Sequence, residues 1–275
     1  TRKESSAASD VYKRQIMSGM PLISFVWLLV GEATLLALAF LFALWRFAPV
    51  SLSVWPKFGN IKPLVKDALP ILLAGLGVII YMRVDQVMLG VMLGQESVGI
   101  YAAAVRISEL WYFVPTAIAA SMFPGLVALR EAGSVGYMSN LRKLYLLMWA
   151  LSLAAVGFIF GAGEMLVHLL YGAAYAGAHP VLVVHILGGI FVGLGVARGK
   201  WIMAENLQIF SLMFTGSGAV INIILNYYFI PEFGVVGAAY ATAISQAVVL
   251  LGVPLMFKTT RRSVFDVLWP FELGR

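Results

Sequence analysis

The sequence predicts an all-α, polytopic membrane protein, and two observations carry this prediction. The chain has 275 residues, of which 61% are hydrophobic and only 12% are charged, whereas soluble domains are about 45–50% apolar and about 25% charged. Its apolar residues also gather into continuous stretches of about 20 residues, the length that a helix needs to cross a bilayer. A globular core of this size could not hide so much apolar surface, so the helices are expected to face lipid.

Seven stretches are long enough to span a membrane, and the fifth is the shortest and rich in glycine. They comprise residues 21–45, 69–94, 98–127, 142–163, 180–197, 207–230 and 235–257. Helices that are apolar all round show little useful periodicity, so length is the main signal. We therefore expect seven transmembrane helices.

The polar segments divide the chain into parts. Residues 1–15 are polar and resemble translated sequencing-adapter sequence, so we expect a non-native tail there. Residues 47–68 hold three prolines and three lysines with aromatic residues between them, which is typical of an interfacial linker. The predicted order is a tail at 1–15, a single helix at 16–46, a cytoplasmic linker at 47–68, a six-helix unit at 69–260 and a cytoplasmic tail at 261–275.

Basic residues occupy every second connection between the predicted spans. These residues are Arg46, Lys57, Lys62, Lys66, Arg130, Arg142, Lys143, Arg198, Lys200, Lys258, Arg261 and Arg262. The intervening connections, at 95–98, 164–179 and 231–234, contain no Lys or Arg. Cytoplasmic loops are enriched in both residues, so the C-terminus is predicted to be cytoplasmic. Topology thus explains the net charge of +6, and we expect no nucleic-acid partner.

Four ionisable residues lie inside two neighbouring predicted spans. Such residues usually face the bundle interior or a water-filled cavity and mark ion or substrate paths. At about 1.5 Å per residue, counted from the turn near 95–97, Arg83 and Glu109 both lie about 18 Å deep, and Asp85 and Arg106 about 15 Å deep. These matched depths allow two opposite-charge pairs, Arg83 with Glu109 and Asp85 with Arg106.

Helix geometry prevents both pairs from forming equally well. Residues 83 and 85 are about 200° apart around a helix, whereas 106 and 109 are about 60° apart. Only one of Arg83 and Asp85 can point straight at the neighbouring span, and the other is expected to face a central cavity. Two interpretations stay open: a neutral ion-pair cluster that fixes helix packing, or a polar wall that binds an anionic group or a coupling cation.

Two further candidates lie on other spans. Glu32 is the lone acidic residue of the first span; it either pairs with a residue elsewhere, sits protonated, or carries a coupling ion. Asn222 shares a helix face with Asn226, four residues later. Hydrogen bonds between helices explain this pair, and a substrate-binding role is the alternative.

The sequence carries no signature of an enzyme, a metal site or a cofactor. Cysteine is absent, which excludes disulfides and thiolate metal sites. The three histidines lack metal-ligand spacing, and no nucleotide-binding or catalytic-serine motif occurs in a suitable context. A transport activity of this chain would therefore draw on an ion gradient or on the substrate gradient.

Four segments in order resemble bacterial O-antigen and polysaccharide flippases of the multidrug/oligosaccharidyl-lipid/polysaccharide exporter superfamily. They are "RVDQVMLG" (83–90), "VGIYAAAVRISE" (98–109), "LLYGAAYAGA" (169–178) and "PEFGVVGAAYATAIS" (231–245). The resemblance covers residues 16 to about 260. It implies two six-helix lobes, of which this chain would supply the last helix of the first lobe and the whole second lobe. We accordingly expect an incomplete fragment of a twelve-helix transporter.

The resemblance also implies a function. The cargo would be a polyprenyl-pyrophosphate-linked oligosaccharide for O-antigen, lipopolysaccharide or other polysaccharide synthesis, flipped across the bacterial inner membrane by alternating access. Arg83 or Arg106 would hold the pyrophosphate, because guanidinium matches phosphate oxygens with paired hydrogen bonds. Asp85 and Glu109 would balance the charge of the site or carry a coupling proton or sodium ion. Polysaccharide assembly proteins are further candidate partners.

Three rival interpretations remain. A multidrug or cation antiporter of the same superfamily would favour an acidic cavity without arginine. A membrane polysaccharide polymerase or ligase would be expected to carry its active residues in a large outer loop, and the longest predicted one has about 16 residues. A passive membrane scaffold would tolerate the replacement of all four charges in the second and third spans by apolar residues.

Overall fold

The computed structural model describes residues 22–47 and 83–270. Within these ranges every regular element is a helix, which confirms the predicted all-α class. The chain divides into two units, Thr1–Ile71 and Leu72–Arg275, and each is described by itself. The predicted adapter-like tail at 1–15 and the linker beyond Phe47 lie outside the described residues.

The first unit contributes α2 (Leu22–Phe47), a helix of 26 residues. At 1.5 Å per residue it is about 39 Å long, more than the roughly 30 Å of a bilayer's hydrocarbon core. It coincides with the first predicted span, and Arg46 lies in its last turn.

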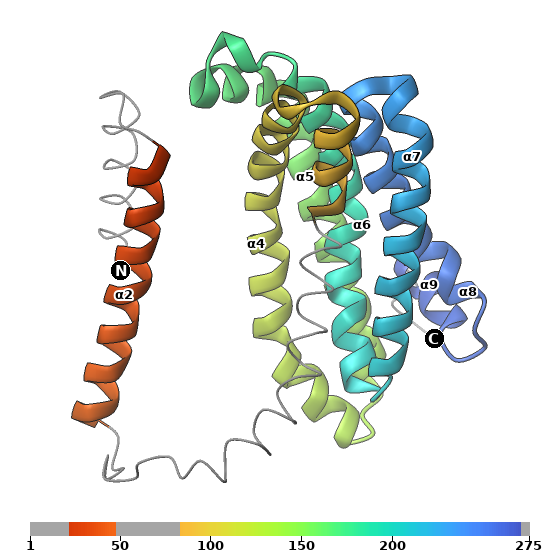
Figure 1. Ribbon diagram of the computed structural model, residues 1–275. Coiled ribbons are helices and arrows are strands. Elements are labelled where there is room, and N and C mark those ends of the chain that lie inside the picture. Colours follow the sequence, from red (N-terminus) through yellow and green to blue (C-terminus); the bar gives the residue numbers. More distant parts are fainter. Residues whose placement is uncertain (1–21, 48–82, 271–275) are drawn as a thin grey trace, which may run out of the picture. The chain divides into compact units, whose positions relative to one another are not determined.

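The second unit is a bundle of long helices (Figure 1). A helical segment over residues 83–93 passes through Gly94 into α4 (Gln95–Glu131), followed by α5 (Gly136–Tyr171), η1 (Ala173–Tyr175), α6 (Ala178–Ala204) and α7 (Gln208–Ala247). A π-helical turn, η2 (Val248–Gly252), then leads through α8 (Val253–Leu255) to α9 (Arg261–Leu268). Helices α4, α5 and α6 and the stretch from Gln208 to Leu255 are each long and apolar enough to cross a membrane.

Helix α7 folds back on itself at Gly234. This residue has φ 62° and ψ −140°, a left-handed conformation that favours glycine. The Asn222 side chain donates a hydrogen bond to Thr242 Oγ1 at 3.2 Å, although residues 20 positions apart on a straight helix would be about 30 Å apart. The two arms pack so closely that a Cβ on Gly237 would lie 2.1 Å from the Phe229 carbonyl oxygen. The sixth and seventh predicted spans are therefore the two arms of a tight hairpin.

Several helices run further than predicted. Helix α5 continues to Tyr171, so the predicted outer loop at 164–179 shrinks to a short turn around η1. Helix α6 continues to Ala204, past Arg198, Gly199 and Lys200, because η2 supplies hydrogen-bond acceptors for the Arg198 side chain. The placement of Arg198 in a connection is thus wrong. This residue lies within α6 at 3% exposure and donates hydrogen bonds to the carbonyl oxygens of Val249 and Leu250 in η2.

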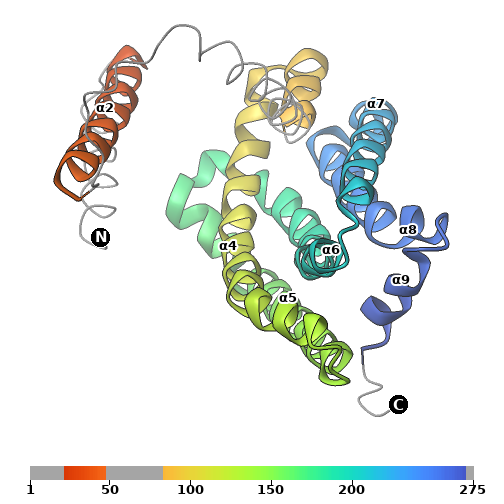
Figure 2. The ribbon, with the colours of Figure 1, turned by 90° about the horizontal axis from the view of Figure 1, so that it is seen from below.

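Helix α6 is the central element of the bundle. It contacts α4, α5 and α7, and Figure 2 shows it lying between them. Its glycines permit this close packing. A Cβ on Gly188 would lie 3.1 Å from Ala243 Cα, and one on Gly193 would lie 2.7 Å from Ser152 Oγ. The glycines noted in the fifth predicted span thus let the neighbouring helices surround α6.

Candidate functional site

A polar cavity lies inside the second unit. Its volume is about 160 Å³, room for a few water molecules at roughly 30 Å³ each. Side chains from the 83–93 segment, α4, α6 and both arms of α7 enclose it. The lining residues are Asp85, Val105, Glu109, Tyr112, His185, Val192, Asn222, Thr242 and Gln246. Three of the six residues proposed from the sequence, Asp85, Glu109 and Asn222, therefore share one cavity.

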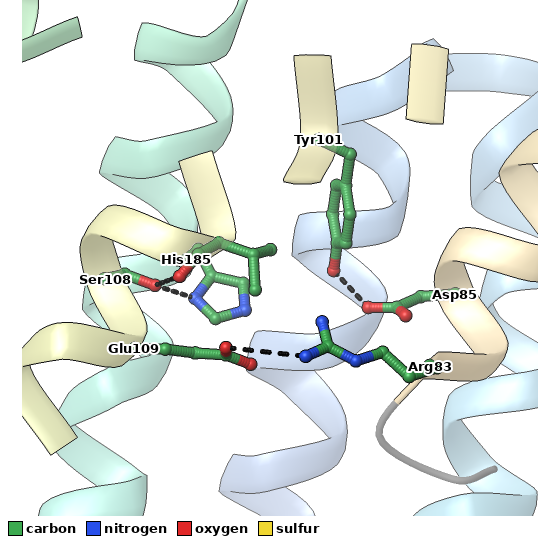
Figure 3. A network of polar contacts seen from close by, with 7 residues as sticks. Arg83, Asp85, Tyr101, Ser108, Glu109 and His185 are labelled. Carbon is green, nitrogen blue, oxygen red and sulfur yellow. Dashed lines mark hydrogen bonds and ion pairs between the residues drawn. The ribbon is translucent and has the colours of Figure 1, made fainter. Parts of the chain in front are cut away.

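Asp85 is buried, with 7% of its surface exposed. Gly94 reverses the chain so that the 83–93 segment and the start of α4 form a hairpin, which brings Asp85 opposite Tyr101. The Tyr101 hydroxyl donates a hydrogen bond to one Asp85 carboxylate oxygen, and the Gln86 backbone N–H donates to the other at 2.8 Å. Figure 3 shows the tyrosine pointing directly at the carboxylate. Both carboxylate oxygens therefore accept hydrogen bonds.

A directed chain of hydrogen bonds continues from Tyr101 into α7. Because the Tyr101 proton points to Asp85, the Tyr101 oxygen accepts from the Thr242 hydroxyl at 3.4 Å. Thr242 in turn accepts from the Asn222 amide nitrogen at 3.2 Å, and the Asn222 oxygen accepts from the Asn226 amide nitrogen at 2.9 Å. Every donor in this chain points towards the carboxylate, which is the arrangement that stabilises a negative charge on Asp85.

The far end of this hydrogen-bond chain has an unsatisfied acceptor. Asn226 is fully buried, and its Oδ1 atom has no hydrogen-bond partner among the described residues. A buried acceptor without a partner costs about 1–3 kcal/mol. Across residues 83–270, moreover, no ion pair with Asp85 is found. The cluster thus combines a buried carboxylate with one amide oxygen, Asn226 Oδ1, that has no hydrogen-bond partner among the described residues.

Arg83 is the residue of the two that pairs with a charge on the neighbouring helix, α4. Its guanidinium lies 4.0 Å from the Glu109 carboxylate, with 51% of the Arg83 side chain and 27% of the Glu109 side chain exposed. Figure 3 shows the two side chains reaching towards each other from their separate helices. A direct charge-assisted hydrogen bond would measure about 2.7–2.9 Å. The pair is therefore loose, and the arginine remains accessible.

A second buried polar pair faces the same cavity. His185 Nδ1 lies 2.6 Å from Ser108 Oγ, and Ser108 also donates to the Val105 carbonyl oxygen at 3.1 Å. With the serine proton used in that way, the Nδ1–H of a neutral imidazole donates to Oγ and leaves Nε2 as an acceptor. The Tyr112 ring stacks on the imidazole with ring centres 6.5 Å apart. The stacking and the hydrogen bond together fix the orientation of the ring.

The remaining candidates lie away from this cavity. Arg106 is exposed on α4, and the part of the chain that the structure describes provides no hydrogen bond or ion pair between Asp85 and Arg106. Asp85 faces Tyr101 instead, so that second predicted pair does not form. Glu32 is exposed on α2 in the other unit.

Sequence reasoning missed Tyr101, Thr242 and His185. Thr242 lies in the segment 231–245, which indicated only the family resemblance, and His185 was considered only as a metal ligand. The depth calculation that paired the charges could have found Tyr101, because the same hairpin turn places it within reach of Asp85. A histidine in the middle of an apolar span is itself a signal of a polar environment.

The chain is similar to one described protein family and to two named proteins. Residues 16–130 match the family model described as "Polysaccharide biosynthesis protein". The chain is 30% identical over 217 residues to "Probable flippase AglR" of Haloferax volcanii, an alignment that covers 73% of this chain and 40% of that relative. It is 26% identical over 207 residues to "Probable low-salt glycan biosynthesis flippase Agl15" of the same archaeon, covering 74% of this chain and 44% of the relative. No solved structure matches the chain.

The chain thus spans less than half the length of these two relatives. Both are named flippases, which are transport proteins and not enzymes, in agreement with the non-enzymatic class expected from the sequence. Both come from an archaeon, so a bacterial source and a bacterial inner membrane stay predictions. The helical architecture, the family match over residues 16–130 and the two relatives confirm the resemblance of this chain to the polysaccharide and lipid-linked oligosaccharide flippase family.

Proposed function

We propose that this chain forms part of a flippase that moves a polyprenyl-pyrophosphate-linked oligosaccharide, such as an O-antigen repeat unit, across the inner membrane by alternating access. The name of one relative, Agl15, and the description of the matching family model support a glycan cargo. The observation that carries the proposal is a cavity lined by Asp85 and Glu109 inside an apolar helical bundle, with the half-exposed Arg83 guanidinium 4.0 Å from Glu109. Charged groups in such a bundle are costly, and they are retained where they line a substrate or ion path.

Arg83 and Arg106 are the proposed contacts for the pyrophosphate. Arg83 is held by Glu109 only at 4.0 Å and is half exposed, so an anionic headgroup can displace the carboxylate with little loss. Arg106 is exposed on α4, close in sequence to Glu109. A guanidinium offers planar, paired donors that match phosphate oxygens, and it stays charged at every physiological pH. On this proposal Glu109 neutralises Arg83 while the cargo is away.

Asp85, Asn222 and Thr242 form the proposed site for the coupling ion. Small hard cations prefer carboxylate, carbonyl and hydroxyl oxygens, and these residues, with the unsatisfied Asn226 oxygen, supply that set within one buried cluster. Sodium would bind the oxygens directly. A proton would instead neutralise Asp85 and break the direction of the hydrogen-bond chain that Tyr101 begins.

A chimera tests the cargo assignment. This chain would replace the matching region of the Haloferax relative Agl15, which is named a probable low-salt glycan biosynthesis flippase, and delivery of glycan to the cell surface would be measured. Because an arginine that binds phosphate cannot be replaced by a neutral amide, Arg83→Gln and Arg106→Gln should each reduce delivery. The matched control is Lys143→Gln, which removes an exposed positive charge elsewhere.

All variants would be compared at equal membrane expression. Full delivery in Arg83→Gln and in Arg106→Gln would remove both arginines from the transport path. A parent chimera that localises correctly but delivers no glycan would contradict the flippase assignment itself.

The coupling ion is tested on the purified chain without any cargo. Sodium should raise the melting temperature relative to potassium at constant ionic strength, because a ligand that binds only the folded state stabilises it by about 2.7 kcal/mol at a hundredfold excess over Kd. For a unit of this size that equals about 5–10 °C. Asp85→Asn should abolish the effect, whereas Glu164→Gln, an exposed acidic residue on α5, should retain it.

A stabilisation that follows pH and not sodium, and that Asp85→Asn removes, would identify the proton as the coupling ion. Indifference of the parent chain to both sodium and pH would exclude Asp85 as the coupling site and would leave the cargo assignment to the chimera.

A further inference from the structure

Helix α9 (Arg261–Leu268) has two different faces. It follows the last membrane-crossing stretch, which ends at Leu255, after a turn of only five residues. Its position in the chain therefore places it close to the end of the bundle, where hydrocarbon gives way to the headgroup region. A helix in this place lies along the interface when it presents basic side chains together with Trp, Phe or Leu to the membrane.

One face of α9 is fixed to the bundle. Val264 and Val267 are buried, the Val267 carbonyl oxygen accepts a hydrogen bond from Trp149 Nε1 at 2.9 Å, and Asp266 forms an ion pair with Arg142 of α5 at 3.5 Å. These contacts come from α5, which α9 also touches together with α6. The helix therefore presents its opposite face in a fixed orientation.

The opposite face is both basic and aromatic. Phe265 is 63% exposed and Leu268 is 45% exposed, and Arg261 and Arg262 are exposed beside them. At about 100° per residue these four side chains fall within an arc of about 120°. Trp269 follows directly after the helix and is also exposed. A continuous strip of arginine, phenylalanine, leucine and tryptophan thus faces away from the protein.

We propose that this strip docks on the anionic headgroups of the membrane leaflet at this end of the bundle. Arginine matches phosphate oxygens, and Phe and Trp are the side chains that settle at the boundary between headgroups and acyl chains. Lys258, exposed in the preceding turn, adds a third positive charge. The strip would hold the end of the last span at a fixed depth, independently of which cargo or ion the cavity takes.

Charge favours a lipid surface over a protein partner. The strip contains no acidic residue, since the acidic side chain of α9, Asp266, points into the bundle and pairs with Arg142. Each Lys or Arg near an anionic membrane surface strengthens binding to that surface by about fivefold, the equivalent of about 1 kcal/mol. The three basic residues of the strip are thus matched to a surface of uniform negative charge.

Site-specific labelling can test this proposal, because the chain contains no cysteine. A single Phe265→Cys or Leu268→Cys variant of the full chain would carry an environment-sensitive fluorophore and be reconstituted in vesicles of equal parts phosphatidylcholine and phosphatidylglycerol. A quencher attached to the acyl chain of either lipid would then be added at the same mole fraction. Quenching by the phosphatidylglycerol derivative should exceed that by the phosphatidylcholine derivative by more than about twofold.

Two controls define the result. Arg261→Gln combined with Arg262→Gln should bring the ratio of the two quenching efficiencies close to one while the label stays in contact with lipid. A label at Leu169→Cys, 75% exposed in the last turn of α5 beside a turn without Lys or Arg, should be quenched by both lipids without preference.

Three results would overturn the proposal. Equal quenching by both lipid derivatives, with Arg261 and Arg262 in place, would show that the strip has no preference for anionic lipid. A label on α9 that only an aqueous quencher reaches would show that the strip faces water. A label that neither quencher reaches would show that protein covers the strip.

Discussion

Replacing Arg198 by methionine should destabilise the bundle substantially. Arg198 is buried in α6 and donates to two carbonyl oxygens of the π-helical turn η2, at 2.9 Å to Val249 and at a short distance to Leu250. Hydrogen bonds from a charged donor contribute about 1.5–3 kcal/mol each, so their loss amounts to about 3–6 kcal/mol. Relief from burying a guanidinium opposes this loss. We expect a net decrease in the free energy of unfolding of about 2–4 kcal/mol.

The measurement is thermal unfolding of the purified chain in detergent. A loss of about 3 kcal/mol in a unit of about 200 residues lowers the melting temperature by about 6–12 °C. Lys200→Met is the matched control, since it removes a positive charge two residues later on the same helix. The Lys200 ammonium lies 5.2 Å from the centre of the Phe123 ring, a contact that contributes about 0.5–1 kcal/mol.

The comparison separates two roles that the sequence could not distinguish. If both arginine and lysine only set the orientation of the chain, the two variants should unfold at the same temperature. Equal melting temperatures would therefore refute the assignment of Arg198 as the group that satisfies η2. A much lower temperature for Arg198→Met alone would support it.

Two further predictions concern other contacts in the second unit. Glu205 accepts hydrogen bonds from Arg130 and Tyr137, both at 3.0 Å, and the Arg130 hydrogen bond lowers the Glu205 pKa. The resulting stabilisation is present above the unfolded-state pKa and is lost as the pH falls through the folded-state pKa. The melting-temperature difference between the parent and Glu205→Gln should therefore shrink on acidification below about pH 4–5. Gly188→Val should lower the melting temperature, because its Cβ would meet the last span and overpacking costs about 1–3 kcal/mol. Gly195→Ala should leave the melting temperature unchanged, because no atom lies within 4 Å of a Cβ at this position. An unchanged melting temperature in Gly188→Val would contradict the close contact at Gly188. A melting-temperature difference for Glu205→Gln that does not depend on pH would contradict the Glu205 hydrogen bonds.

The fold class and the helix positions could be predicted because they depend on local composition. Membrane spans require about 20 apolar residues, and that requirement is met or failed within each stretch alone. Helix ends were predicted less well, as the extension of α6 beyond 197 illustrates. A basic residue such as Arg198 interrupts an apolar pattern in the sequence, but the helix continues where another element supplies its partners, and here η2 does so.

The candidate site was predictable in depth but not in direction. Counting residues from the turn at Gly94 placed Arg83 level with Glu109, and the structure joins them at 4.0 Å. The same count placed Asp85 level with Arg106, which it does not meet. Depth follows from the rise per residue, whereas the facing direction follows from how each helix is rotated against its neighbours, and that rotation depends on packing contacts across the whole bundle.

The rotation of the 83–93 segment has a chemical consequence. A pairing of Asp85 with Arg106 would have neutralised the carboxylate within one helical hairpin. Its pairing with Tyr101 instead links the carboxylate through Thr242 to the two arms of α7. Any event that changes the charge on Asp85 therefore changes the hydrogen bonds between that hairpin and α7. On the proposed coupling role, ion binding at this cluster would alter helix packing, and such a link is what coupling an ion gradient to a conformational change requires.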